Sequence, residues 1–145
     1  MALTEFLGVA GFFFAIASFL TTFLHGRHVN KRDLLIKIHD QMTSIENQQG
    51  RKILIDLDKK NESIDTLSDD QHALANKALS TIDIMGFYCE KRYIKRKVVL
   101  DLWAPSLRRL SGKAEEFMSK LDKEKDRTTW PHCRNLINAA KNRAA

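Results

Sequence analysis

The stretch FLGVAGFFFAIASFLTTFL, residues 6–24, sets the architecture expected of this chain. It carries no charged side chain, and as a helix it would rise about 28 Å, close to the roughly 30 Å thickness of a bilayer's hydrocarbon core. A secretory signal peptide is the alternative, but such peptides begin with basic residues, whereas here Glu5 is the only charged residue before the run. We therefore expect residues 1–26 to form a transmembrane anchor that crosses the membrane once.

Small residues of this run fall on one side of the expected helix, at alternating spacings of four and three. They are Thr4, Gly8, Gly11, Ala15, Ser18 and Thr22, and we call them the small-residue seam. Lipid tails are as apolar as leucine, so membrane helices associate where small residues let their backbones approach closely. The seam predicts a homo-oligomer, although small residues are also common in membrane helices that do not associate. A tight bundle would bury the seam, and a larger ring would line a weakly polar pore with Thr4, Ser18 and Thr22.

Charge around the run predicts its orientation. The chain has 24 basic and 18 acidic residues, a net charge of +6. Arg27, Lys31 and Arg32 follow the apolar run and no basic residue precedes it. Because cytoplasmic flanks carry the excess of lysine and arginine, we expect residues 27–145 to be cytoplasmic, at the inner (cytoplasmic) membrane, with the N-terminus outside.

The remaining residues show helical periodicity and no alternating strand pattern. We expect helices over about 34–57 and from a Ser68 cap to Glu90, with a polar loop over 58–70 between them. A third segment, about 93–122, contains Pro105, where it either kinks or divides into two helices. Thr128 or Thr129 would cap a last helix that ends near Asn142. The fold class predicted is all-α: one N-terminal transmembrane helix followed by a cytoplasmic bundle of four or five helices.

Cysteine and histidine usage argues against a metal or cofactor site. Cys89 and Cys133 lie far apart, without a CxxC pair or a cysteine and histidine cluster. This usage is typical of a reducing compartment and excludes structural zinc of the common spacings. We expect no metal, no cofactor and no small-molecule substrate.

A basic cluster follows the helix that ends at Glu90. It comprises Lys91, Arg92, Lys95, Arg96 and Lys97, with Tyr93 between them. Such a cluster binds the phosphates of RNA or the anionic head groups of lipids. A solvated helix face, or a contact with the acidic residues of a partner, is the alternative. Because the domain is expected to be tethered, the lipid bilayer has to be considered before nucleic acid.

Arg127 and His132 precede the last helix at the spacing R-x4-H. An arginine and a histidine held together can polarise a phosphodiester and exchange protons with a 2′-hydroxyl. The spacing resembles the RxxxxH motif of the HEPN ribonucleases, which are helical bundles whose paired motifs form a site at a dimer interface. Thr128 departs from the amide, acid or histidine common after that arginine. An arginine and a histidine separated by four to six residues also occur by chance, and Arg32-x6-His39 is a second such pair in this chain.

Two wider resemblances concern the whole layout. Residues 82–90, residues 98–103 and the pair Trp130-Pro131 resemble a family of small bacterial single-pass membrane proteins with a helical cytoplasmic domain. The span, the helical domain and the late RxxxxH are also similar to the membrane-bound, HEPN-like accessory protein of RNA-targeting CRISPR systems. That resemblance implies a HEPN-like fold and an oligomeric membrane pore that depolarises the cell in antiviral defence.

Three functions follow as hypotheses. The first is a membrane-anchored helical protein that homo-oligomerises through the small-residue seam, as a pore used in defence. The second is a membrane-tethered HEPN-like ribonuclease, with Arg127 and His132 catalytic and the basic cluster binding RNA. The third is a membrane scaffold with neither pore nor chemistry. The sequence favours a protein that is not an enzyme.

Overall fold

A computed structural model describes residues 2–143, apart from the side chains of residues 2–15, 17, 23–25 and 27–29. The chain divides into two units, Met1–Ile36 and Lys37–Ala145. The sequence places its domain boundary ten residues earlier, after residue 26, where the apolar run gives way to charged residues. Residues 27–36 belong to the first of these two units.

The first unit is helical. One helix, α1 (Ala2–Thr43), runs through Gly26, so this glycine does not interrupt it. Among the side chains described, Ile16, Phe19 and Leu20 are 41%, 70% and 51% exposed. The hydroxyl of Thr22 donates to the Ser18 carbonyl at 2.8 Å, a bond within the helix.

Among the residues that the structure describes, no helix is long and apolar enough to cross a membrane. The expected span, residues 6–24, falls largely on side chains outside those described. The same holds for Thr4, Gly8, Gly11 and Ala15 of the small-residue seam, whereas Ser18 and Thr22 are described and exposed.

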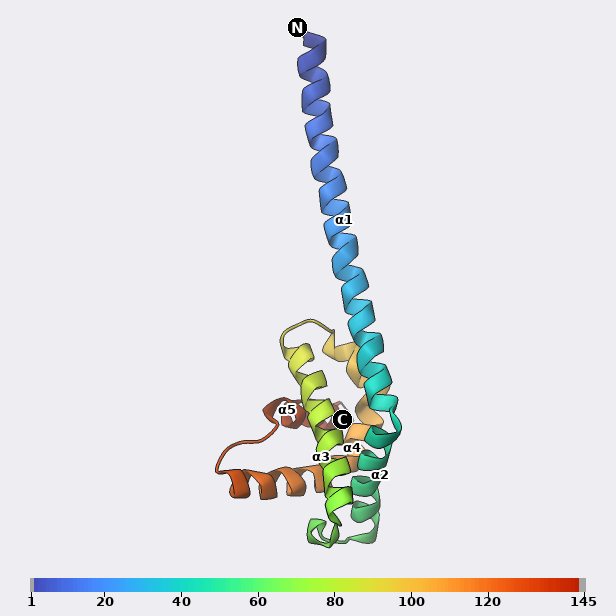
Figure 1. Cartoon of the computed structure of the whole chain (residues 1–145), viewed down its shortest axis with the longest axis vertical. Helices are drawn as coiled ribbons and strands as arrows, with labels where there is room; N and C mark the ends of the chain where they lie inside the picture. Colours follow the sequence, from blue (N-terminus) through green and yellow to red (C-terminus); the bar gives the residue numbers. More distant parts are fainter. Residues whose placement is uncertain (1, 144–145) are drawn as a thin grey trace. The chain divides into compact units, whose positions relative to one another are not determined.

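The second unit is a helical bundle. After residues 37–43 of α1 come α2 (Ile45–Lys60), the short 3₁₀ helix η1 (Ile64–Thr66), α3 (Asp69–Glu90), α4 (Arg96–Lys125) and α5 (Pro131–Asn142) (Figure 1). No strand occurs in residues 2–143, which confirms the all-α class. Helix α3 packs against α2 and α5, and α4 packs against the same two helices. Their buried core includes Leu54, Leu79, Ile82, Met85, Leu107, Leu110, Phe117 and Ile137.

Helix α3 matches the sequence expectation closely. The Ser68 hydroxyl accepts a hydrogen bond from the Gln71 amide, and the Gln71 side chain accepts from the Ser68 amide at 3.1 Å. This reciprocal capping box satisfies two amides that have no partner within the helix. The apolar spacing of this segment predicts one buried face with Leu74, Ala78, Ile82, Met85 and Cys89. The last four are buried, and Leu74 is half-buried.

Helices α4 and α5 begin at other points than the sequence indicates. Helix α4 starts at Arg96 because Arg92 has a φ of 59°, which ends the preceding turn. It then continues through Pro105 to Lys125 as one helix. Helix α5 is capped by neither Thr128 nor Thr129. Its N-cap is Trp130, with a φ of 46° and no capping side-chain bond.

Two glycines mark where α3 meets its neighbours. A Cβ at Gly50 of α2 would lie 2.1 Å from the Leu74 carbonyl oxygen, and one at Gly86 of α3 would lie 2.4 Å from the His132 carbonyl oxygen. Both contacts are with backbone atoms, which cannot rotate away. Glycine at these positions therefore allows α2 and α5 to approach α3, and Gly86 brings the start of α5 against the end of α3.

Candidate functional site

His132 lies in the first turn of α5, against the C-terminal end of α3. Its Nδ1 atom is 2.7 Å from Oε2 of Glu90. The other oxygen of Glu90 accepts a hydrogen bond from the Asn135 amide at 2.8 Å. The Phe87 ring meets the imidazole edge to face, with 5.3 Å between ring centroids. We call Phe87, Glu90, His132 and Asn135 the His132 cluster.

The sequence positions this cluster through contacts between α3 and α5. Pro131 is the first residue of α5, a position that suits its fixed φ and missing amide hydrogen. The amide of Cys133 donates to Oδ1 of Asp83 at 2.9 Å, so α3 supplies the acceptor that no N-cap side chain provides. Together with the glycine contact at Gly86, this bond fixes the imidazole against Glu90.

The pairing of His132 with Glu90 is an arrangement that acid–base catalysts use. A carboxylate that accepts from Nδ1–H selects one imidazole tautomer and leaves Nε2 free to exchange protons. The hydrogen bond from Asn135, helped by that from His132, lowers the pKa of the Glu90 carboxyl, so Glu90 is charged at neutral pH. The side chains of His132 and Glu90 are each 28% exposed, and solvent reaches both. The same contact also fastens α5 to α3.

Arg127 lies apart from this cluster, in the turn between α4 and α5. Its amide donates to the Asp122 carbonyl at 3.3 Å, and its side chain is exposed. It lines an open hollow of about 260 Å³ with Asn76 and Ser80 of α3, and His132 is not part of that lining. In the described part of the chain, no hydrogen bond, ion pair or cavity joins the two residues of the RxxxxH spacing.

Asp122 orders the turn that contains Arg127. Its Oδ1 accepts from both the amide and the hydroxyl of Thr129 at 2.6 Å, and its other oxygen pairs with Arg134. The Thr129 hydroxyl bond is the main cause that lowers the pKa of Asp122. The Trp130 ring stacks on Phe117, which lies 6.3 Å away, and so helps to hold a strained φ of 46°. The sequence does not predict that Asp122 caps this turn, because the spacing of seven residues from Asp122 to Thr129 matches no local capping pattern.

The basic cluster occupies the turn between α3 and α4 and the first residues of α4. Lys91, Arg92, Lys95, Arg96 and Lys97 are all exposed. The Lys91 ammonium lies over the Phe87 ring, 5.7 Å from its centroid. Helix α4 begins with no capping side chain and no acidic residue in its first turn. The structure therefore brings the five cations together at one helix start, as their contiguity in the sequence requires.

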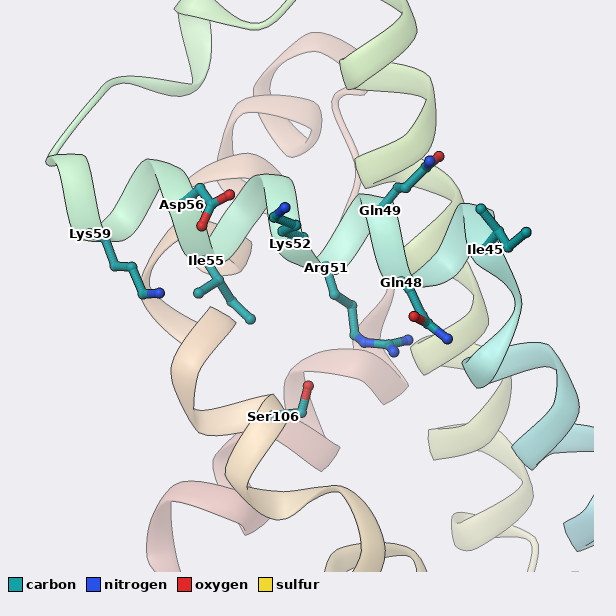
Figure 2. Close-up of a pocket in the computed structure, with 9 residues that line it drawn as sticks. All are labelled: Ile45, Gln48, Gln49, Arg51, Lys52, Ile55, Asp56, Lys59 and Ser106. Carbon is teal, nitrogen blue, oxygen red and sulfur yellow. The ribbon is translucent and has the colours of Figure 1, made fainter.

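An open groove of about 510 Å³ lies between α2 and α4. Figure 2 shows Arg51 of α2 reaching across it toward Ser106 of α4. The guanidinium of Arg51 donates to the Met42 carbonyl at 2.7 Å and lies 5.3 Å from the centre of the Trp103 ring. Burial lowers the pKa of Arg51. Its hydrogen bond to Met42 and its contact with Trp103 join α2 to α1 and to α4, so we interpret Arg51 as a packing residue.

Metal and thiol chemistry find no support in the residues described. No group of three histidine, cysteine, aspartate or glutamate side chains there could hold a metal ion. Cys89 and Cys133 are buried and unpaired, and burial raises the pKa of both thiols. A thiol with a raised pKa is a poor nucleophile at neutral pH.

Comparison of the chain with family models, with curated proteins and with solved structures finds no match.

Proposed function

We propose that this chain is a membrane-anchored helical protein that homo-oligomerises through the small-residue seam, with residues 37–145 completing the assembly on the cytoplasmic side. The observation that carries the proposal is the uncharged run of residues 6–24 with six small side chains on one face. The proposal has two forms. In one the assembled helices enclose a pore, the role in antiviral defence that the resemblance implies, and in the other they form a closed scaffold.

Helical geometry supports the seam. Residues 2–43 form one helix, and at 3.6 residues per turn the six seam positions fall within about 80° of arc. Leu20 lies on roughly the opposite side, about 160° from the centre of that arc. Ile16 and Leu20 are exposed on α1, and exposed apolar side chains of this size are typical of surfaces that contact lipid or protein. If the seam faces other copies and Ile16 and Leu20 face lipid, both the alignment of the small residues and the exposure of these apolar side chains are explained.

Cysteine cross-linking in membranes tests the anchor and the seam together. Ser18→Cys places a thiol on the seam and Leu20→Cys places one opposite, while Cys89 and Cys133 are buried. The protein should stay in the membrane fraction after alkaline extraction, and mild oxidation should join Ser18→Cys copies into dimers and leave Leu20→Cys largely monomeric. Extraction at alkaline pH would disprove the anchor. Equal cross-linking of the two variants would disprove the seam.

Ion flux separates the two forms of the proposal. Liposomes that contain the purified protein should release a trapped dye or ion faster than empty liposomes if the assembly encloses a pore. Flux equal to that of empty liposomes, with the seam cross-link intact, would leave the closed scaffold as the function.

A ribonuclease is the second candidate, because the Nδ1 atom of His132 pairs with Glu90 and leaves Nε2 available. In this interpretation a dimer brings the Arg127 of one copy to the His132 of another, and the basic cluster binds the RNA. Arg127 is exposed, so Arg127→Ala should leave the fold intact, and it is the matched partner of His132→Ala. Loss of RNA cleavage in each variant would support catalysis. Equal cleavage by wild type and variants, or none by either, removes it.

A further inference from the structure

The second unit carries opposite charges at its two ends. Residues 91–97 contain five basic side chains and no acidic one. Residues 56–70 contain six acidic side chains and two lysines. In Figure 1 the turn between α3 and α4 lies at the end of this unit where residues 37–43 enter, and η1 lies at the other end. The basic end is therefore the end that is joined to the proposed anchor.

The cations of the basic cluster form no ion pair with the residues that the structure describes. Lysines elsewhere in the unit form ion pairs, such as Lys113 with Glu116 at 2.7 Å and Lys141 with Glu115 at 2.6 Å. In the described residues none of Lys91, Arg92, Lys95, Arg96 and Lys97 forms one. The start of α4 adds the positive end of a helix dipole to this charge. Five cations without an ion pair repel one another, and an anion from outside the chain would reduce this repulsion.

The backbone holds this turn in a fixed shape. The amides of Tyr93 and Ile94 both donate to the Tyr88 carbonyl, at 2.9 and 3.3 Å. Ile94 is buried in the core, which anchors the turn, while the Tyr93 side chain is 50% exposed. Tyrosine is an amphipathic side chain that favours the boundary between lipid and water. An exposed tyrosine among five cations has the composition of a surface that lies on lipid head groups.

We propose that the turn of residues 91–97 binds the anionic head groups of the membrane in which residues 6–24 are anchored; this rests on the anchor proposed above. Arg27, Lys31 and Arg32 also follow the apolar run in the sequence, before the second unit begins at Lys37. Basic side chains close to a membrane span attract acidic lipids, and the tether raises the local lipid concentration. RNA is the weaker candidate, because single-stranded RNA is bound by several stacking aromatic side chains and Tyr93 is the one exposed aromatic residue of this turn.

Limited trypsin cleavage of the full-length protein in vesicles tests this proposal. The protein is reconstituted into phosphatidylcholine vesicles with or without phosphatidylserine, and cleavage after residues 91–97 is compared with cleavage after Lys59 and Lys60. The basic turn should be cut about tenfold more slowly in the anionic vesicles, and about 0.5 M salt should abolish the difference because it screens exposed charges. Cleavage after Lys59 and Lys60 should be the same in both.

Charge-reversal variants make the test specific. The double variant Lys95→Glu, Lys97→Glu should lose the protection by anionic lipid. The matched variant Lys59→Glu, Lys60→Glu, which makes the same change in charge at the opposite end, should keep it.

The outcomes distinguish this proposal from the anchor on which it rests. Equal cleavage of the turn in neutral and anionic vesicles overturns head-group binding and leaves the anchor standing. Loss of the protein from neutral vesicles in an alkaline wash overturns the anchor and this proposal with it. Protection by added single-stranded RNA, without protection by anionic lipid, assigns the turn to nucleic acid and also overturns it.

Discussion

Asp122 shows how much of the α4–α5 connection depends on one carboxylate. Its two oxygens accept hydrogen bonds from Thr129 and from Arg134, and the bonds from Thr129 are 2.6 Å long. Asparagine at this position would keep one oxygen that can accept from Thr129. It would lose the negative charge and the oxygen that pairs with Arg134, and a charged donor left without its acceptor costs about 1–3 kcal/mol.

We predict that Asp122→Asn lowers stability at pH 7 and flattens its dependence on acid. The pKa of Asp122 is lowered in the folded protein, above all by the Thr129 hydroxyl bond. The unfolded chain, with an aspartate pKa of about 3.9, therefore takes up the proton first as the pH falls. The stabilisation is complete above that pKa and is lost as the pH falls through the folded value. Urea unfolding in detergent at pH 7 and at pH 3 measures both effects.

Asp126→Asn is the matched control for this prediction. Asp126 is exposed and has a φ of 48°, a conformation that asparagine adopts readily. Its unfolding midpoint at pH 7 should match that of the wild type. A midpoint for Asp122→Asn that equals the wild type at both pH values would contradict the role given to Asp122.

At the scale of single residues, the sequence identifies His132 and Arg127 but not their surroundings. The imidazole pairs with Glu90, which lies 42 residues earlier, and the turn depends on Asp122 and Asp83. Glu90 and Asp83 meet α5 only when it packs on α3, so no local spacing in the sequence predicts these contacts. The basic cluster was visible in the sequence because its residues are contiguous.

Helices were predictable where local signals decide them. Ser68 and Gln71 cap α3 through bonds that span three residues, and the apolar spacing of α3 matches its buried face. Pro105 was ambiguous, because a proline inside a helix costs about 3 kcal/mol and only packing decides whether that cost is offset. Leu107, Leu110 and Phe117 beyond it are buried, which keeps α4 in one piece.

The start of α4 yields a prediction at this scale. Lys95 is its N-cap, provides no capping bond, and is followed by Arg96 and Lys97 at the positive end of the helix dipole. An aspartate there could accept from a backbone amide of the first turn and would offset the dipole, so Lys95→Asp should stabilise the protein by about 1 kcal/mol. Thermal unfolding followed by circular dichroism measures the change.

Ser68→Ala is the reference for that measurement. It removes the capping box of α3 and should lower stability by about 1 kcal/mol. If Lys95→Asp leaves the unfolding temperature unchanged while Ser68→Ala lowers it, the missing N-cap bond of α4 does not limit stability. A stabilised Lys95→Asp that also loses protection by anionic lipid would indicate that the basic turn is retained for binding.

The whole molecule combines two parts that its sequence separates clearly. An uncharged run with a small-residue seam precedes a bundle whose ends carry opposite charge. Composition alone identifies the N-terminal apolar run, because a contiguous apolar run needs no tertiary information. Helix α3 runs the length of the second unit, and this places the basic turn at the end where residues 37–43 lie. No local pattern in the sequence predicts that arrangement.

Assembly through the seam is the central claim, and the mass of the intact protein in detergent tests it most directly. Light scattering after size-exclusion chromatography, corrected for bound detergent, should give a multiple of 16.7 kDa for the wild type. Gly11→Leu with Ala15→Leu should shift the mass to that of one chain, because leucine keeps the backbones apart. Phe13→Leu, on roughly the opposite side of the helix, should keep the wild-type mass. A wild-type protein of one chain, or an assembly whose mass the seam variant leaves unchanged, would contradict the account.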